Sequence, residues 1–420
     1  MSVRPMKWLG VIVLIGILAF AATVHAETPV VKTSIGSMSI FGNFQAGFNY
    51  YIGDEVLGSV TDTKGNAAPG AVDRGKDLEF RLRLIRFGFK GFILQDKITY
   101  FLQIEGNSNE AVQLRDAQLG FKYIPYTTFL IGRYLPHFQY WTPIHTGKTF
   151  FVEYPMMNQF FGIQRHTGFD IAFNHKYVDA YLGVYNGHDF RNMAAVLNPT
   201  DRVDANGDAL GLGNPAWNTD ENTAKDIYFS VDGKPIKGLD IWAGVWYGTP
   251  LDYYENDEGE LIAHNATITA FDAGAGYVAD WGLRIWAEFF MSQLSYDSAY
   301  FNNGSKEDRA DDTYELNSMS YYVRLGYNIK SVSGVPLEFL VQYDYLDPDT
   351  LNDEEKHGAD DERTEITGGV NYYIQDYNAM IYLNYIAKME AYKDLLNKAG
   401  DDVQDGLDND EIRVLFQVSF

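Results

Sequence analysis

Charged side chains recur at every second position in several short segments of this chain, which makes them candidates for a common task. Residues 78–84, LEFRLRL, set Glu79, Arg81 and Arg83 between leucine and phenylalanine. Because successive side chains of a strand point to opposite faces, this segment has one charged face and one apolar face. The candidates on such polar faces are the basic residues Arg81, Arg83, Arg86, Lys90, Lys122, Arg284, Arg324 and Arg413 and the acidic residues Glu79, Asp116, Asp170, Glu288, Glu338 and Asp344.

The aromatic-rich segment Pro136–His166 supplies further candidates. It is too apolar to lie free in water, and packing against an inner wall would bury it and narrow the enclosed space. That placement puts Lys148, Glu153 and Arg165 near the narrowest point. A surface flap or a contact between subunits is the alternative. The spacing of its three histidines fits no standard metal motif; they are His137, His145 and His166.

Other polar clusters lack the arrangement that metal binding or catalysis needs. Asp204–Asp208, DANGD, resembles the start of a calcium-binding turn, but Pro215 stands where the motif closes with glutamate. His188 and Asp189 form an isolated pair without a nucleophile signature. The chain has no cysteine, which excludes disulfides, thiolate metal sites and covalently attached c-type haem. We therefore expect no enzymatic activity, no metal and no cofactor.

The elements that must position these residues are strands with alternating faces. The last ten residues, EIRVLFQVSF, set five apolar side chains in one phase and Arg413, Gln417 and Ser419 in the other, with Leu415 as an exception. Sixteen such segments are found. They lie at about 40–52, 78–92, 98–106, 113–123, 128–135, 167–174, 178–185, 226–232, 239–248, 266–278, 283–294, 317–328, 337–346, 364–374, 379–388 and 411–420.

One of these segments changes phase part of the way along. In Leu78–Phe92 the apolar side chains Phe80, Leu82 and Leu84 share one face, but from Ile85 onward the alternation is shifted by one residue. One extra residue in a strand indicates a β-bulge. We expect Phe80, Leu82 and Leu84 to face outward and Arg81 and Arg83 to face inward.

The connections between the segments alternate between short turns and long loops. This alternation, together with an even number of strands, is typical of an up-and-down barrel that crosses a membrane. Residues 1–26 have the basic start, apolar run and small-residue end of a secretory signal peptide. No other apolar run approaches the about 20 residues that a spanning helix needs, so a crossing must use strands in a closed sheet.

The net charge of the chain limits the kinds of partner it can bind. Removing Arg4 and Lys7 with the signal peptide leaves 31 basic and 57 acidic residues, a formal charge of −26. Such a negative chain is not expected to bind nucleic acid. We predict an all-β, antiparallel transmembrane barrel over residues 38–420, after a short periplasmic segment at 27–37. The chain's ending resembles the C-terminal signal of bacterial outer-membrane barrels, and this resemblance implies an assembly signal in Phe416, Val418 and Phe420.

Four stretches resemble the phosphate-selective porin O and P family of outer-membrane proteins. They are Leu78–Gly91, Leu114–Lys122, Leu130–Phe138 and Arg165–Phe173, the last followed by Tyr185–Gly187 at the end of the next hairpin. The resemblance implies a sixteen-stranded trimeric porin whose third loop folds into the lumen and whose basic residues conduct anions. The chain departs from the family in its many acidic residues on the polar faces, which puts the phosphate preference in doubt.

The expected function is therefore a water-filled diffusion channel for small ions and solutes in a Gram-negative outer membrane. The expected partners are outer-membrane lipid and lipopolysaccharide, the barrel-assembly machinery, two further copies of the chain and small ionic solutes. The alternative is a structural barrel that sheathes or anchors a partner such as an electron-transfer cytochrome, which would lack an inward aromatic loop. The acidic residues of the long loops, above all Asp347–Glu362, are expected to surround the outer mouth.

Overall fold

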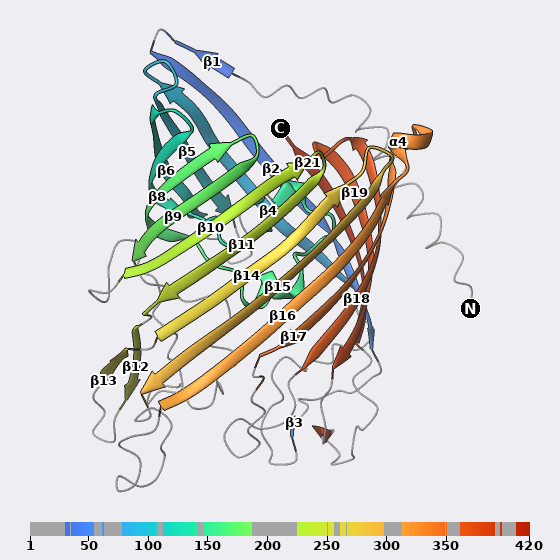
Figure 1. Ribbon diagram of the computed structural model, residues 1–420. Coiled ribbons are helices and arrows are strands. Elements are labelled where there is room, and N and C mark those ends of the chain that lie inside the picture. Colours follow the sequence, from blue (N-terminus) through green and yellow to red (C-terminus); the bar gives the residue numbers. More distant parts are fainter. Residues whose placement is uncertain are drawn as a thin grey trace, which may run out of the picture.

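The chain folds into one closed antiparallel barrel of sixteen strands (Figure 1). The computed structural model describes residues 30–33, 35–53, 61–62, 78–106, 112–141, 144, 146–186, 225–249, 251–255, 261–265, 267–297, 313–348, 350, 362–390, 395–396 and 409–420. The predicted signal peptide, His145, His188–Asp189, Asp204–Asp208 and most of Asp347–Glu362 lie outside these residues.

The predicted strands are confirmed, each paired with the next along the chain. The first eight are β2 (Gly36–Gly53), β4 (Leu78–Ile93), β5 (Ile98–Gly106), β6 (Val112–Ile124), β7 (Thr127–Tyr134), β8 (His166–His175), β9 (Val178–Asn186) and β10 (Lys225–Ile236). The others are β11 (Leu239–Gly248), β14 (Thr267–Val278), β15 (Leu283–Asp297), β16 (Thr313–Asn328), β17 (Leu337–Asp347), β18 (Arg363–Gln375), β19 (Ala379–Glu390) and β21 (Asn409–Ser419).

Smaller elements accompany the barrel. β1 (Val30–Lys32) pairs with the start of β2, β12 (Leu251–Glu255) forms a hairpin with β13 (Leu261–Asn265), and β3 (Thr61–Asp62) pairs with β20 (Leu395–Leu396). The described helices are the 3₁₀ turn η1 (Thr146–Lys148), α2 (Met156–Phe160) and α4 (Lys330–Ser333). In the described part of the chain, none of the helices has the length and hydropathy of a membrane span.

The two faces of each strand differ as the alternation predicts. On β17, Phe339, Val341 and Tyr343 are 48%, 44% and 37% exposed on the outer face. The side chains between them, Gln342 and Asp344, are buried on the inner face. Apolar side chains therefore form the outer surface of the barrel, as a hydrocarbon environment requires.

The bulge predicted in β4 is present, but it lies two residues earlier than the shift in the sequence pattern suggests. Gln45 of β2 pairs with Leu84 and Ala46 pairs with Leu82, so Arg83 is the extra residue. Leu84 shares the inner face with Gln45 and is only 5% exposed. The prediction that Leu84 faces outward is wrong, whereas Phe80 and Leu82 are exposed on the outer face.

The barrel closes where β21 pairs with β2, from Asn43 opposite Ser419 to Gly53 opposite Asn409. The terminal residue continues this pairing, because the backbone groups of Phe420 and Gly42 exchange two hydrogen bonds of 3.1 Å. A Cβ atom on Gly42 would lie 2.5 Å from Cζ of Phe420, so the terminal ring covers this glycine. Val418 and Phe420 are exposed on the outer face and Phe416 belongs to the same face.

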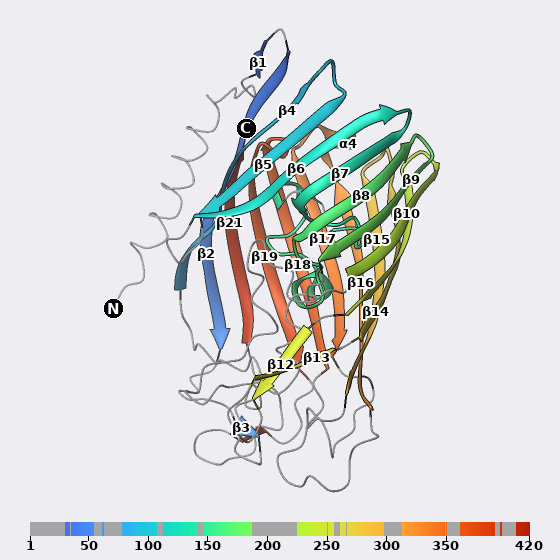
Figure 2. The ribbon, with the colours of Figure 1, turned by 90° about the vertical axis from the view of Figure 1, so that its left-hand side faces the viewer.

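The hydrophobic core lies inside the barrel rather than between two layers. The connection from β7 to β8, residues 135–165, enters the lumen and packs against the inner wall; we refer to it as the third loop. Figure 2 shows its helical turn, in teal, enclosed by the ring of strands. The largest cluster of buried apolar residues combines this loop with the inner faces of β8 to β17.

Candidate functional site

Hydrogen bonds fix the third loop to strands all around the wall. Its backbone N–H groups at Tyr140 and Met156 donate to Glu288 of β15 (2.9 Å) and Asp344 of β17 (3.1 Å). Farther along, Val152 N–H donates to the side-chain oxygen of Asn384 on β19 (2.8 Å). The wall amides of Asn371 and Gln417 donate in turn to carbonyl oxygens of the loop. The predicted inward fold is confirmed.

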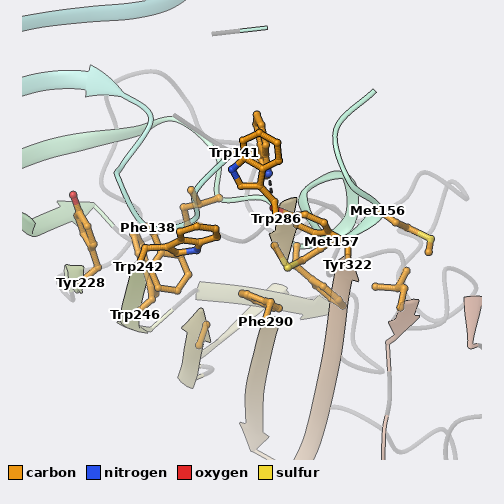
Figure 3. Packing of buried hydrophobic residues seen from close by; sticks show 14 of the residues in the cluster. Phe138, Trp141, Met156, Met157, Tyr228, Trp242, Trp246, Trp286, Phe290 and Tyr322 are labelled. Carbon is orange, nitrogen blue, oxygen red and sulfur yellow. Dashed lines mark hydrogen bonds between the residues drawn. The ribbon is translucent and has the colours of Figure 1, made fainter. Parts of the chain in front are cut away.

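Aromatic side chains fill the space between the loop and the wall (Figure 3). Trp141 of the loop lies 6.0 Å from Trp286 between ring centroids, and Phe161 stacks on Phe290 at 5.2 Å. The loop approaches the wall closely at Gly244, where a Cβ atom would lie 3.0 Å from the ring of Phe138. This part of the lumen is therefore a packed core that solutes do not enter.

Most of the acidic residues predicted to line the passage are buried. Asp170, Glu288, Glu338 and Asp344 lie on inner faces, but their exposures are 0%, 2%, 0% and 2%. Each accepts hydrogen bonds there: for example, Asp170 accepts from the hydroxyls of Tyr185 (2.7 Å) and Tyr228 (3.0 Å). The prediction that these four carboxylates face the open lumen is wrong. The loop backbone binds Glu288 and Asp344, and wall side chains bind Asp170 and Glu338.

Arg324 of β16 is also enclosed. It is 1% exposed, its Nε donates to Gln342 (2.6 Å), and its guanidinium lies 4.6 Å from the Trp141 ring and 5.1 Å from the Phe151 ring. Contacts of this kind between a guanidinium and aromatic faces are attractive. Arg324 therefore packs between the wall and the third loop. The prediction that it lines the open passage is wrong.

A band of ion pairs follows the wall on the other side of the lumen, from β19 through β21, β2, β4 and β5 to β7. Its recurring unit is one carboxylate between two cations. Glu153, from the loop, binds Arg81 (2.8 Å) and Arg83 (2.9 Å) of β4. Glu411 of β21 binds Arg413 (2.6 Å) and Lys388. We call this band the arginine band; it comprises the two units just described and two more, centred on Glu105 and Asp116.

Two further units complete the arginine band. Glu105 of β5 pairs with Arg86 and with Arg115 of β6. Asp116 of β6 binds Arg165 at the end of the loop with two hydrogen bonds of 3.0 and 3.1 Å, and it also attracts Arg133 of β7. Neighbouring units interact, since Arg413 is attracted to Glu153 and Arg86 is repelled by Arg165.

Two β-bulges place arginines in this band. Arg83 is the extra residue of β4, and Arg115 is the extra residue of β6, where Gln103 pairs with Asp116 and Ile104 with Leu114. At each bulge two consecutive side chains contact the lumen instead of one. The bulge in β6 and the roles of Arg115, Arg133, Lys388, Glu105 and Glu411 were not predicted from the sequence.

The arginine band has an excess of positive charge. Its ion-paired units contain eight cations (Arg81, Arg83, Arg86, Arg115, Arg133, Arg165, Lys388, Arg413) and four carboxylates (Glu105, Asp116, Glu153, Glu411), so their formal charge is 8 − 4 = +4. Glu365 of β18, which lies opposite Lys388 and attracts Arg413, adds one negative charge beside the band. The side chains of Arg81 and Arg115 are 39% and 32% exposed, which places positive charge in the open part of the lumen.

The remaining predicted residues lie outside the band. Glu79 accepts a hydrogen bond from Tyr51 (2.9 Å), and Lys90 lies 5.4 Å from the ring of Phe41. Lys122 lines a cavity of about 380 Å³ beside the short turns of β4–β5 and β6–β7. Lys148 is exposed on η1 of the loop, and Arg284 pairs with the enclosed Glu338 at 3.0 Å.

Histidine placement gives no sign of a metal centre among the described residues, where no three His, Asp or Glu side chains converge. His137 stacks on Tyr181 with ring centroids 4.3 Å apart, and His166 packs against Tyr185 and Trp246. Burial lowers the pKa of His137 to about 4, although Asp179 acts in the opposite direction, so its ring is neutral at pH 7.

Comparisons with known proteins identify the fold. No protein-family model matches the chain, and no curated protein matches it. The outer membrane channel DcaP of Acinetobacter baumannii is 11% identical with a TM-score of 0.58, covering 94% of this chain and 100% of that one. OmpT of Vibrio cholerae without its loop L8 is 12% identical (TM-score 0.57; 92% and 100% covered), and OmpF of Salmonella typhi with daunomycin is 12% identical (0.56; 93% and 100%). The chain has the closed barrel of the outer-membrane porins.

Proposed function

We propose that this protein is a non-enzymatic diffusion channel of a Gram-negative outer membrane and that its passage favours small anions. The arginine band carries this proposal, because its ion pairs leave a formal charge of +4 and the guanidinium groups of Arg81 and Arg115 reach the open part of the lumen. A solute in the open lumen meets these arginines but cannot contact the enclosed carboxylates Asp170, Glu288, Glu338 and Asp344. A fixed positive surface in a narrow aqueous space raises the local concentration of anions.

Features of the fold support the channel over the alternative of a barrel that sheathes a protein partner. The third loop occupies the lumen and packs a core of aromatic side chains against β8 to β17. A bulky guest such as a cytochrome would have to displace that core. The similar structure from Acinetobacter baumannii is itself described as an outer membrane channel.

The proposed location and assembly follow from the same surface. The apolar outer face fits a bilayer with outer-membrane lipid and lipopolysaccharide around it, and the terminal strand offers Phe416, Val418 and Phe420 to the barrel-assembly machinery. A homotrimer is proposed by analogy, since in-vitro folded OmpT of Vibrio cholerae has a trimer form.

Planar-bilayer recording of the purified protein tests the proposal. We expect steady single-channel currents and, in a gradient of potassium chloride at molar concentration, a reversal potential of the sign that chloride permeation gives. The triple variant Arg81→Gln, Arg83→Gln, Arg165→Gln should lose this preference. Barrels that fold but pass no current, or that prefer potassium at molar salt, would overturn it.

Preference for phosphate, which the resemblance to the phosphate-selective porins implies, is a finer proposal with its own measurement. Phosphate should reduce chloride current at concentrations far below that of chloride, because the partly exposed guanidinium groups of Arg81 and Arg115 can form hydrogen bonds with its oxygens. Sulfate at equal charge serves as the control. Equal block by the two anions would leave a general anion channel.

A further inference from the structure

Two glutamines face each other on the inner side of the closing seam. Nε2 of Gln45 on β2 donates to Oε1 of Gln417 on β21 over 2.6 Å, and the two residues are 372 positions apart in the chain. Their exposures are 0% and 2%. A buried primary amide has several donor and acceptor sites to satisfy, so the other partners of this pair show what it holds in place.

Gln417 binds the tip of the third loop. Its Nε2 donates to the carbonyl oxygen of Gly147 (2.8 Å) and to that of Tyr377 in the β18–β19 turn (2.7 Å). Its Oε1 also accepts from the hydroxyl of Tyr382 on β19 (3.2 Å), which lies 3.3 Å from the carbonyl oxygen of Thr149. The closing strand therefore contacts the loop where η1 meets the wall.

Gln45 connects the seam to the arginine band. Its Oε1 accepts a hydrogen bond from Nη1 of Arg83. The same guanidinium binds Glu153 through Nη2 (2.9 Å) and Nε (3.3 Å). One continuous route thus runs from Gly147 through Gln417, Gln45 and Arg83 to Glu153, and both of its ends belong to the third loop.

We propose that Gln45 and Gln417 are positioning residues that dock the tip of the third loop only after the barrel has closed. Neither strand alone offers the complete set of partners, because the first and the last strand each supply one amide. Closing the seam therefore builds the surface that orients Arg83 toward Glu153. The inference rests on the proposed function only in assuming that the position of the third loop shapes a passage for solutes.

A neighbouring seam pair shows what a purely stabilising contact looks like. Nδ2 of Asn43 donates to Oγ of Ser419 over 2.7 Å, on the same two strands and the same inner face. In the described residues this pair makes no hydrogen bond to the third loop. Ser419→Ala removes one seam hydrogen bond without touching the loop, which makes it the matched control for substitutions at Gln417.

The test needs a reporter of loop position that does not depend on current. The chain has no cysteine, and Val152 at the loop tip is 3% exposed against Tyr373, Met380, Tyr382 and Leu415. In the reporter variant Val152→Cys the thiol should react slowly with a water-soluble maleimide. Adding Gln417→Leu or Gln45→Leu should speed labelling roughly tenfold or more, the effect of losing one buried hydrogen-bond partner. Adding Ser419→Ala should leave the labelling rate unchanged.

Barrel closure is followed separately by the shift in gel mobility between unheated and boiled samples. We expect all these variants to keep that shift. Gln417→Glu covers the case in which Gln417→Leu does not close, because the carboxylate can still accept from Gln45 but cannot donate to Gly147. A reporter thiol that stays protected in closed Gln45→Leu and Gln417→Glu barrels would overturn the proposal, and so would equal acceleration by Ser419→Ala. A protein that labels as expected but carries no current would contradict the channel and leave this inference standing.

Discussion

At the scale of single residues, Glu153 is the side chain that connects the third loop to the arginine band. It is the one carboxylate of the arginine band that comes from the tip of the third loop, and it lies between Arg81 and Arg83. Burial would raise the pKa of Glu153, but the guanidinium groups of Arg83, Arg413 and Arg81 outweigh it and lower the pKa to about 2. The carboxylate is therefore ionised at any pH in which the barrel is expected to work.

Replacing Glu153 by glutamine should strengthen the anion preference. The change keeps the shape and a hydrogen-bond acceptor for Arg83, but it raises the formal charge of the band from +4 to +5. Reversal potentials at molar potassium chloride measure the effect, with Glu79→Gln as the control because Glu79 lies outside the band and binds Tyr51. A shift toward potassium in Glu153→Gln would show that the glutamate does not act through its charge.

The pH dependence of this ion pair has a definite sign. The folded-state pKa of Glu153 is about 2, below the ordinary value of 4.5, so its ionised form stabilises the docked loop above pH 4.5. This stabilisation should be lost as the pH falls from 4.5 toward 2. Because protonation of a thiol slows its reaction with maleimide, the rate is taken relative to that of a free thiol at the same pH. We expect this relative labelling rate of Val152→Cys to rise over that range. In the Glu153→Gln background this acceleration should be absent, and its persistence there would assign the acid effect to other groups.

At the scale of elements, alternation was sufficient to find all sixteen strands, because a wall with water-facing and lipid-facing sides repeats every second residue. The sequence reveals the bulge in β4, because the apolar residues after it occupy the alternate positions of the pattern. It does not reveal the bulge in β6, because both Arg115 and Asp116 are polar and the pattern gives no sign of a shift. Leu84 was misplaced for a related reason: the pattern shows that a slip occurs but not which residue is extra.

The faces of β4 can be tested with two neighbouring residues. Leu82 is 53% exposed on the outer face, so Leu82→Arg places a charge against hydrocarbon at a cost of about 2–4 kcal/mol near the midplane. We expect less folded barrel in detergent, measured by the gel shift on boiling. Arg81→Gln, one residue away on the inner face, should fold normally and change the current. Equal folding of both variants, with normal currents, would mean that the register is wrong.

The contact between Phe420 and Gly42 makes a prediction for the seam. A Cβ atom on residue 42 would lie 2.5 Å from the terminal ring, and overpacking of this kind costs about 1–3 kcal/mol. Gly42→Ala should therefore lower the temperature at which the barrel opens, as should Phe420→Ala. In the double variant the alanine at 42 should cost little, because the ring it collides with is gone. Additive losses would show that the ring does not lie over the glycine in the membrane.

At the scale of the whole molecule, the third loop helps to decide which charged side chains remain exposed to the lumen. The sequence places acidic and basic side chains on the same faces, and from alternation alone the lumen looks evenly mixed. In the structure the predicted carboxylates of β8, β15 and β17 are enclosed, whereas Arg81 and Arg115 of the arginine band stay partly exposed to the lumen. This sorting depends on contacts between residues up to 270 positions apart, such as Gly147 with Gln417, and short-range patterns carry no information about them.

Selectivity should therefore depend on the salt concentration. The band lies inside the lumen, whereas Asp347–Glu362, with eight carboxylates, is expected at the outer mouth and should attract cations. The Debye length is about 3 Å at 1 M salt and about 30 Å at 0.01 M, so the mouth is screened from the passage only at high salt. We expect an anion preference at 1 M that falls or reverses on dilution. Shortening Asp347–Glu362 should alter reversal potentials only in dilute salt, whereas neutralising Arg81, Arg83 and Arg165 should remove the preference at 1 M. A cation preference already present at 1 M would mean that the enclosed carboxylates act through the loop and outweigh the band.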